Sequence, residues 1–173
     1  MPEDIASLDI EEIKERVIRA ISVFGGNEQD ILHPLGSERN ICQRLSYYLQ
    51  NEFVDWHVDT DNDKIIDGTT NTTRRKVARL LIQRFEGRFI HLNEPKETMV
   101  IPDIIVHRRK TRENLLAIEV KIHNDRQEID FDHEKLKAYC LSEDLFYRFA
   151  FFVRFQELDQ NGKFVAETRY FTA

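Results

Sequence analysis

Three residues in the middle of the chain carry charge where a purely structural strand would be apolar. Asp103 follows a proline near the start of the apolar run IPDIIVH, residues 101–107. Glu119 and Lys121 lie two apart in AIEVK, residues 117–121. Successive side chains of a strand point to opposite faces, so Glu119 and Lys121 share one face. If the two runs pair as a hairpin, Asp103 lies beside Glu119, and the three residues form a candidate catalytic site.

The chemistry of this trio follows from its acid pair. Two neighbouring carboxylates repel each other unless a cation lies between them. Hard oxygen ligands with open coordination positions suit Mg²⁺ or Mn²⁺, so we expect Asp103 and Glu119 to bind one of these ions. The alternative is an ordinary surface salt bridge between Lys121 and an acid.

A third carboxylate, Glu38, begins a predicted helix. In SERNICQRLSYYLQNEF, residues 37–53, Ser37 is a natural N-cap and the apolar residues recur at helical spacing. Glu38 therefore lies in the first turn. It is either a ligand of a second metal ion or a first-turn acid favoured by the helix dipole, and the sequence supports both interpretations equally.

These segments resemble the PD-(D/E)XK nuclease superfamily, which has the restriction-endonuclease-like fold. IPDIIVH and AIEVK match its signature through Asp103, Glu119 and Lys121, and the helix that carries Glu38, followed by WHVDTDND, is similar to the start of small bacterial and prophage members. KLKAY, residues 135–139, resembles the Gln-x-x-x-Tyr helix motif of the exonuclease branch, with Lys135 at the glutamine position and Tyr139 matching. The resemblance covers residues 37–155.

The resemblance implies a nuclease active site. Asp103, Glu119 and Glu38 would bind Mg²⁺ or Mn²⁺, which activates a water molecule and offsets charge on the leaving oxygen. Lys121 would orient that water or neutralise developing charge. Lys135 and Tyr139 would approach the substrate. A role in defence or prophage biology follows from the resemblance alone.

The most basic segment of the chain follows a polar loop at residues 61–73. We predict a helix over residues 73–85 and expect Arg75 and Arg79 to contact a phosphate backbone. The alternative, which the sequence supports equally, is a solvated helix face.

Composition limits the class of protein. The chain has 173 residues and 41% hydrophobic content, which suits one domain over residues 1–173, with residues 1–30 as an N-terminal helical addition. A net charge of −6 argues against binding nucleic acid through bulk charge. The sequence contains no apolar segment long enough for a membrane span and only two distant cysteines, so we expect a cytoplasmic protein with buried, reduced thiols.

The remaining pattern predicts an α/β domain. Residues 8–24 read as an amphipathic helix stopped by Gly25-Gly26, and residues 132–142 as a helix capped by Asp130 or Asp132. Strands are expected over residues 56–60, 99–108, 115–123, 147–155 and 163–172. We therefore expect a mixed sheet of four to five strands flanked by helices, and the resemblance implies that this sheet has the restriction-endonuclease-like fold.

The predicted function is metal-dependent hydrolysis of phosphodiester bonds, with DNA favoured over RNA as substrate. The sequence contains neither a glycine-rich phosphate loop nor a nucleophile elbow, which argues against nucleotide triphosphatases and acyl hydrolases. The main alternative is a catalytically silent module of the same fold that binds nucleic acid or a protein partner. Action within a complex or as a homodimer is compatible with the sequence.

Overall fold

The two most apolar segments of the chain form the centre of a five-stranded sheet. β7 (Asn114–Lys121) and β8 (Phe149–Gln156) lie side by side as parallel strands. β6 (Ile104–His107) pairs antiparallel with β7, β1 (His57–Thr60) with β6, and β9 (Val165–Thr172) with β8. The order β1–β6–β7–β8–β9 is a mixed sheet, as predicted.

The computed structural model describes residues 8–32, 37–60, 64–66, 73–122, 124–156 and 165–172. The helices in these ranges are α1 (Ile10–Asn27), α2 (Gln29–Leu32), α3 (Glu38–Glu52) and α4 (Arg126–Leu141). The strands outside the central sheet are β2 (Lys64–Ile66), β3 (Thr73–Arg75), β4 (Val77–Phe85) and β5 (Arg88–Met99).

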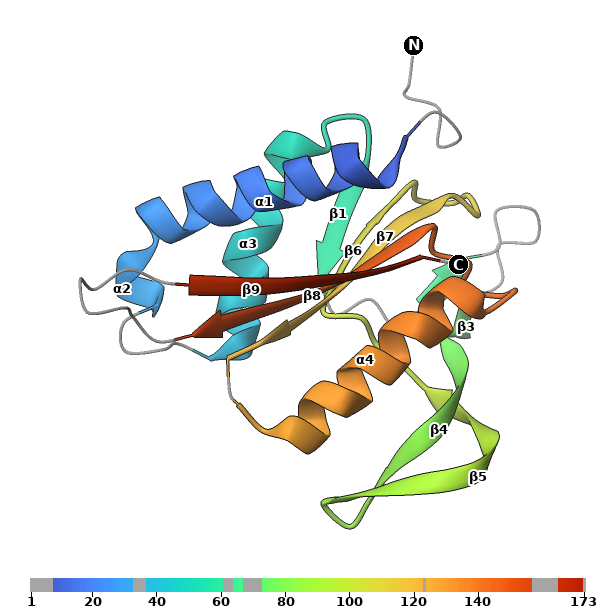
Figure 1. Cartoon of the computed structure of the whole chain (residues 1–173). Helices are drawn as coiled ribbons and strands as arrows, with labels where there is room; N and C mark the ends of the chain where they lie inside the picture. Colours follow the sequence, from blue (N-terminus) through green and yellow to red (C-terminus); the bar gives the residue numbers. More distant parts are fainter. Residues whose placement is uncertain are drawn as a thin grey trace.

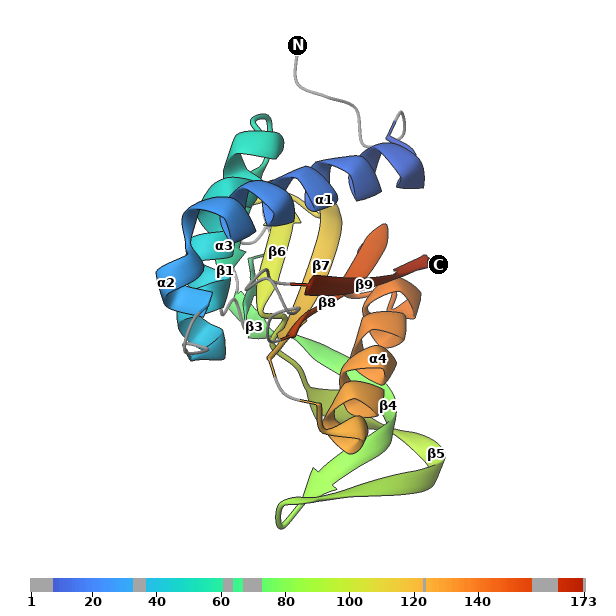
Figure 2. The same ribbon diagram turned by 60° about the vertical axis from the view of Figure 1, so that its left-hand side comes forward.

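Helices cover both faces of the sheet, as expected for an α/β domain. α1 and α3 lie on one face and α4 on the other (Figure 1, Figure 2). Phe24 of α1 and Leu45 of α3 are fully buried in one core with Ile118 of β7. Tyr139 of α4 belongs to a second core that includes Phe152 of β8. Because both faces are covered, nearly every residue of β7 and β8 is buried.

Local sequence signals set the ends of the helices. Asp9 caps α1 by accepting a hydrogen bond from the backbone N–H of Glu12 at 2.8 Å, and Ser37 caps α3. The predicted stop at Gly25-Gly26 is wrong, because α1 continues through both glycines to Asn27. The predicted cap of the last helix is also wrong. α4 begins six residues earlier than predicted, at Arg126 with Asp125 as its cap, so Asp132 lies inside the helix.

The helix predicted over residues 73–85 is wrong, since this segment forms strands β3 and β4. Along β4 the buried residues Ala78, Leu80 and Ile82 alternate with exposed ones, which is the two-residue period of a strand. β4 pairs antiparallel with β5 across Glu86 and Gly87, whose φ angles are 47° and 76°. Positive φ at both central residues is characteristic of the tight turn that joins two strands with the natural twist.

The β4–β5 hairpin stands apart from the central sheet. It projects beyond α4, with its tip near the start of that helix and its base near the helix end (Figure 1, Figure 2). Ala78 and Leu80 pack in the same core as Leu136 and Tyr139 of α4, and the Phe89 and Phe131 rings lie 5.3 Å apart. The hairpin therefore extends the layer that α4 forms on its side of the sheet.

The turn at the hairpin tip provides a test of this fold. Gly87→Ala places a side chain in the left-handed region and should lower the free energy of unfolding by about 1 kcal/mol. Gly25→Ala is the matched control, because Gly25 lies within α1 with open space around its Cβ position and should become more stable by about 0.5–1 kcal/mol. Urea denaturation of the two variants measures both changes. Equal effects of the two substitutions would contradict the hairpin.

Candidate active site

Glu119 is a buried carboxylate at the centre of the sheet. Its side chain leaves β7 on the face covered by α4, and the residue is only 1% exposed. Two α4 side chains donate hydrogen bonds to it: Lys135 Nζ to Oε2 at 2.6 Å and Tyr139 Oη to Oε1 at 2.7 Å. A buried carboxylate is costly unless it is paired and hydrogen-bonded, and α4 provides both forms of compensation.

Asp103 lies beside Glu119 because of the register between β6 and β7. Ile104 pairs with Ile118, so Asp103, one residue earlier, lies opposite Glu119. Asp103 Oδ2 accepts a hydrogen bond of 2.7 Å from the backbone N–H of Val120, which holds the carboxylate against β7. The expected acid pair is thus brought together, although Asp103 precedes the strand rather than lying within it.

Lys121 follows Glu119 on the same face of β7 and lies among three carboxylates. Its Nζ lies 3.0 Å from Asp132 Oδ2, 3.6 Å from Glu128 Oε2 and 3.7 Å from Glu38 Oε2. Glu38 reaches this position from the first turn of α3. The alternative of an ordinary surface salt bridge does not describe Lys121, since the residue is 8% exposed and α4 covers it.

We call this set of residues the acid–lysine cluster. It comprises Glu38, Asp103, Glu119, Lys121, Glu128, Asp132, Lys135 and Tyr139. If every carboxyl and amino group is charged and the Tyr139 phenol is neutral, five carboxylates against two ammonium groups leave three net negative charges.

The crowding of buried carboxylates shifts the pKa values of the acids and of Lys135 upwards. Burial raises the pKa of Glu119 well above its usual value, and the nearby charges of Asp103 and Asp132 raise it further. Burial likewise raises the pKa values of Asp103 and Glu38. Burial alone would lower the pKa of Lys135, but the surrounding carboxylates outweigh it and raise that pKa, so the ammonium stays charged.

The donor chemistry fits a hard divalent cation, because carboxylates in excess repel one another and lower their energy by sharing a cation. The arrangement itself is closed. Both oxygens of Glu119 are hydrogen-bonded within the protein, and no three acidic, histidine or cysteine side chains among the described residues are grouped to hold a metal ion. A cation bound at Glu119 must therefore compete with Lys135.

The residues expected to contact substrate do not lie together in the structure. Lys135 and Tyr139 point inward and hold Glu119. Arg79, on β4, lines a groove beside the end of α4 rather than the acid–lysine cluster, and the side chain of Arg75 lies outside the described part of the structure. Arg84 is the hairpin arginine that reaches the cluster, because its Nη2 lies 3.4 Å from Glu128 Oε1.

Two acids of the cluster, Glu128 and Asp132, are absent from the set predicted from sequence. They join Lys135 and Tyr139 on one face of α4, at intervals of four, three and four residues. This spacing places side chains in one row along a helix. Extending the row backwards from KLKAY would have identified both acids, but the predicted helix began too late to include Glu128.

A second polar cluster lies at the opposite end of β6. Asp59 of β1 accepts hydrogen bonds from Arg109 Nε at 3.0 Å and contacts His107 Nε2 at 2.8 Å. The hydrogen bond from Arg109 lowers the pKa of Asp59 to about 2. His107 is thus engaged in joining two strands, and the β6 strand separates it from Asp103.

Comparisons with protein-family models, curated proteins and solved structures found no match for this chain. Within the described ranges, none of the helices is both long and apolar enough to cross a membrane.

The hydrogen bond from Tyr139 to Glu119 can be tested by Tyr139→Phe. This substitution leaves one oxygen of a buried carboxylate without its donor, and should lower the free energy of unfolding by about 1–3 kcal/mol. Tyr47→Phe is the control, since Tyr47 is 61% exposed and should change stability by less than about 0.5 kcal/mol. Chemical denaturation of both variants measures the difference. Equal stabilities would show that the Tyr139 hydroxyl contributes nothing to holding Glu119.

The Asp59 cluster predicts a pH dependence. The pKa of Asp59 is about 2 in the folded chain and 3.8 without its partners, so its stabilisation is present above pH 3.8 and is lost as pH falls towards 2. Asp59→Asn should therefore destabilise the protein by about 1 kcal/mol at neutral pH and by progressively less in acid. Denaturation of this variant and of the exposed control Asp55→Asn across that range measures the effect. A difference that stays constant down to pH 2 would contradict this assignment.

Proposed function

We propose that this protein is a metal-dependent nuclease of the restriction-endonuclease-like type, with DNA as its substrate. The observation that carries the proposal is the convergence of Asp103, just before β6, with Glu119 and Lys121 of β7, together with Glu38 from α3. A core this acidic destabilises the fold unless cations compensate it. Such a cluster is therefore easier to understand as a catalytic site than as a structural one.

Asp103, Glu119 and Glu38 are the residues that would hold Mg²⁺ or Mn²⁺. Such an ion, when bound, activates water and stabilises charge on the phosphate oxygens. The protein supplies the ligand placement: the Val120 N–H holds Asp103, and Tyr139 holds one oxygen of Glu119. Tyr139 and Lys135 are thus positioning residues for Glu119.

Lys121 is the residue best placed to act on the substrate. Its ammonium is charged because the carboxylates of Asp132 and Glu38 outweigh the effect of burial and raise its pKa. A fixed positive charge beside a phosphate stabilises the negative charge that develops during hydrolysis. Asp132 and Glu128 contact the Lys121 ammonium and would hold it in position for this role.

The hairpin tip gives a route for binding the phosphate backbone near the cluster. Arg84 is largely exposed and lies beside Glu128, and Arg88 begins β5 directly after the turn. A two-stranded ribbon can lie in the major groove of duplex DNA. We therefore infer that Arg84 rather than Arg79 would bind the backbone, with Arg75 retained as a candidate because it precedes the same hairpin.

One observation favours the second candidate, a catalytically silent module that binds nucleic acid or a protein. Lys135 already compensates Glu119, and this internal ammonium can replace a metal ion as the counter-charge. In that case the acid–lysine cluster stabilises the fold without performing chemistry. The two candidates differ in whether a divalent cation binds and whether Lys121 affects cleavage.

Cleavage assays separate these candidates. Wild-type protein should cut DNA in the presence of Mg²⁺ or Mn²⁺, and Lys121→Ala should lower the rate by about 10²-fold or more. Asp103→Asn keeps an acceptor for the Val120 N–H but should weaken metal binding, as measured by calorimetry. Linear, circular and single-stranded DNA, together with RNA, define the substrate class.

The matched control is Lys137→Ala, which removes an exposed lysine of the same helix outside the cluster and should leave the rate unchanged. Circular dichroism confirms that each variant is folded. A folded wild-type protein that neither binds the ions nor cuts any substrate would establish the silent module instead.

A further inference from the structure

A groove separates the base of the β4–β5 hairpin from the end of α4. It has a volume of about 1060 Å³, larger than the usual pocket for a small molecule. Its walls are formed by residues from β4, β5, α4 and the turn after α4. These are Val77, Arg79, Glu97, Glu134, Lys137, Ala138, Leu141, Ser142, Glu143 and Asp144.

Large apolar side chains are exposed at this groove. Leu141, in the last turn of α4, is 72% exposed, and Val77 on the hairpin is 37% exposed. Met99 is the cross-strand partner of Val77, so its 51% exposed side chain lies on the same face. Scattered exposed apolar residues are ordinary, but grouping around a groove indicates an interaction site.

Phe146 provides an independent observation beside the groove. It follows the lining turn, and its backbone N–H donates to the carbonyl of Ser142 at 2.8 Å. Its φ angle is 40°, a region that disfavours a bulky side chain, and the residue is 65% exposed. The backbone at Phe146 is therefore strained, and burial of the aromatic ring does not offset the strain. Such strain is commonly retained where the displayed side chain has a function.

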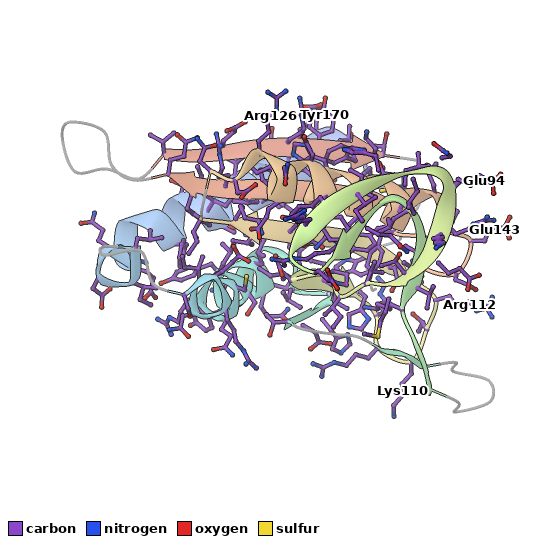
Figure 3. All side chains as sticks on the ribbon, turned by 90° about the horizontal axis from the view of Figure 1, so that it is seen from below. Glu94, Lys110, Arg112, Arg126, Glu143 and Tyr170 are labelled. Atoms are coloured by element: carbon purple, nitrogen blue, oxygen red, sulfur yellow. The ribbon has the colours of Figure 1, made fainter. Side chains whose placement is uncertain are left out.

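The charge of the groove identifies the kind of partner. Four carboxylates, those of Glu97, Glu134, Glu143 and Asp144, line it against the two cations Arg79 and Lys137. Figure 3 looks onto the hairpin from below and shows Glu143 and Glu94 at the same edge of the molecule. An acidic rim repels the backbone of a nucleic acid and attracts a basic segment. Val77, Ala138 and Leu141 add apolar side chains to the same lining, and this combination suits an amphipathic peptide.

We propose that this groove binds a basic amphipathic segment of a partner protein. The leucine-type side chains of that segment would lie on Val77, Ala138 and Leu141, and its lysine or arginine groups would face the acidic rim. The groove and the acid–lysine cluster lie on different sides of α4, with Glu134 and Leu141 facing the groove and Asp132 and Tyr139 facing the sheet. The inference is independent of the proposed nuclease activity.

The probe is a short fluorescent peptide of leucine, alanine and lysine with the apolar residues at helical spacing. Two matched peptides carry glutamate in place of every lysine or serine in place of every leucine. The leucine–lysine peptide should bind wild-type protein at least about tenfold more tightly than either control, and added salt should weaken its binding. Equal binding of the glutamate peptide, or no binding of the leucine–lysine peptide, would overturn the proposal.

The variants Leu141→Ser and Phe146→Asn identify the surface used. Both residues are exposed, and asparagine tolerates the backbone conformation of Phe146, so the fold should be retained. Each variant should lower peptide affinity by about tenfold. Val54→Ser is the matched control, because Val54 is 77% exposed at a distant position after α3 and should have no effect.

Amide resonances of the labelled protein locate the contact. The peptide should shift the resonances of Val77, Ala138, Leu141 and Ser142. Shifts confined to the acid–lysine cluster would show that the peptide binds another acidic site and would overturn the proposal. A short DNA duplex serves as the second ligand, and shifts of the groove resonances by DNA instead of the peptide would assign this surface to nucleic acid.

Discussion

The structure depends on the compensation of one buried carboxylate. Glu119 lies in the central strand β7, where water is excluded, and an unpaired charge there costs several kcal/mol. Lys135 and Tyr139 remove that cost only if α4 lies across this part of the sheet in one rotation about its axis. The pair therefore fixes the orientation of α4, and with it the positions of Asp132 and Glu128 around Lys121.

The orientation of α4 also organises the surface that surrounds it. β4 packs against α4 through the same core as β7, and the Leu81 N–H donates to Glu134 at 3.2 Å. With this contact, β4 runs antiparallel to α4. Its tip, with Arg84, then lies beside the acid–lysine cluster, while its base forms the groove near Leu141. One helix thus separates a candidate catalytic surface from a candidate protein-binding surface.

Stability and metal binding make opposing demands on Glu119. The Lys135 ammonium stabilises the carboxylate, and the same contact occupies an oxygen that the proposed metal ion would need. A cation therefore binds only to the extent that its interaction with the carboxylates exceeds that of the ammonium group. The proposed nuclease and the silent module are two outcomes of this single competition.

The sequence by itself determined the central sheet and the acid pair. Two-residue alternation and unbroken apolar runs are local properties, so the strands around Asp103 and Glu119, the capped helix of Glu38 and the mixed sheet could all be predicted. Tertiary structure decided what those charges contact. Whether Glu119 and Lys121 face solvent or a helix depends on packing between segments distant in sequence, and a strand pattern is the same in both cases.

The secondary structure of the β4–β5 hairpin also could not be predicted from the sequence alone. The segment around Arg79 has enough apolar residues to fit either period, and its arginines suit an exposed helix face as well as a strand. Pairing with β5, which supplies the missing backbone hydrogen bonds, decided in favour of the strand. The start of α4 was equally open in the sequence, because Asp125, Asp130 and Asp132 are all chemically suitable caps. In the structure the Asp125 side chain accepts from the backbone N–H groups of Gln127 and Glu128, so Asp132 lies within the helix.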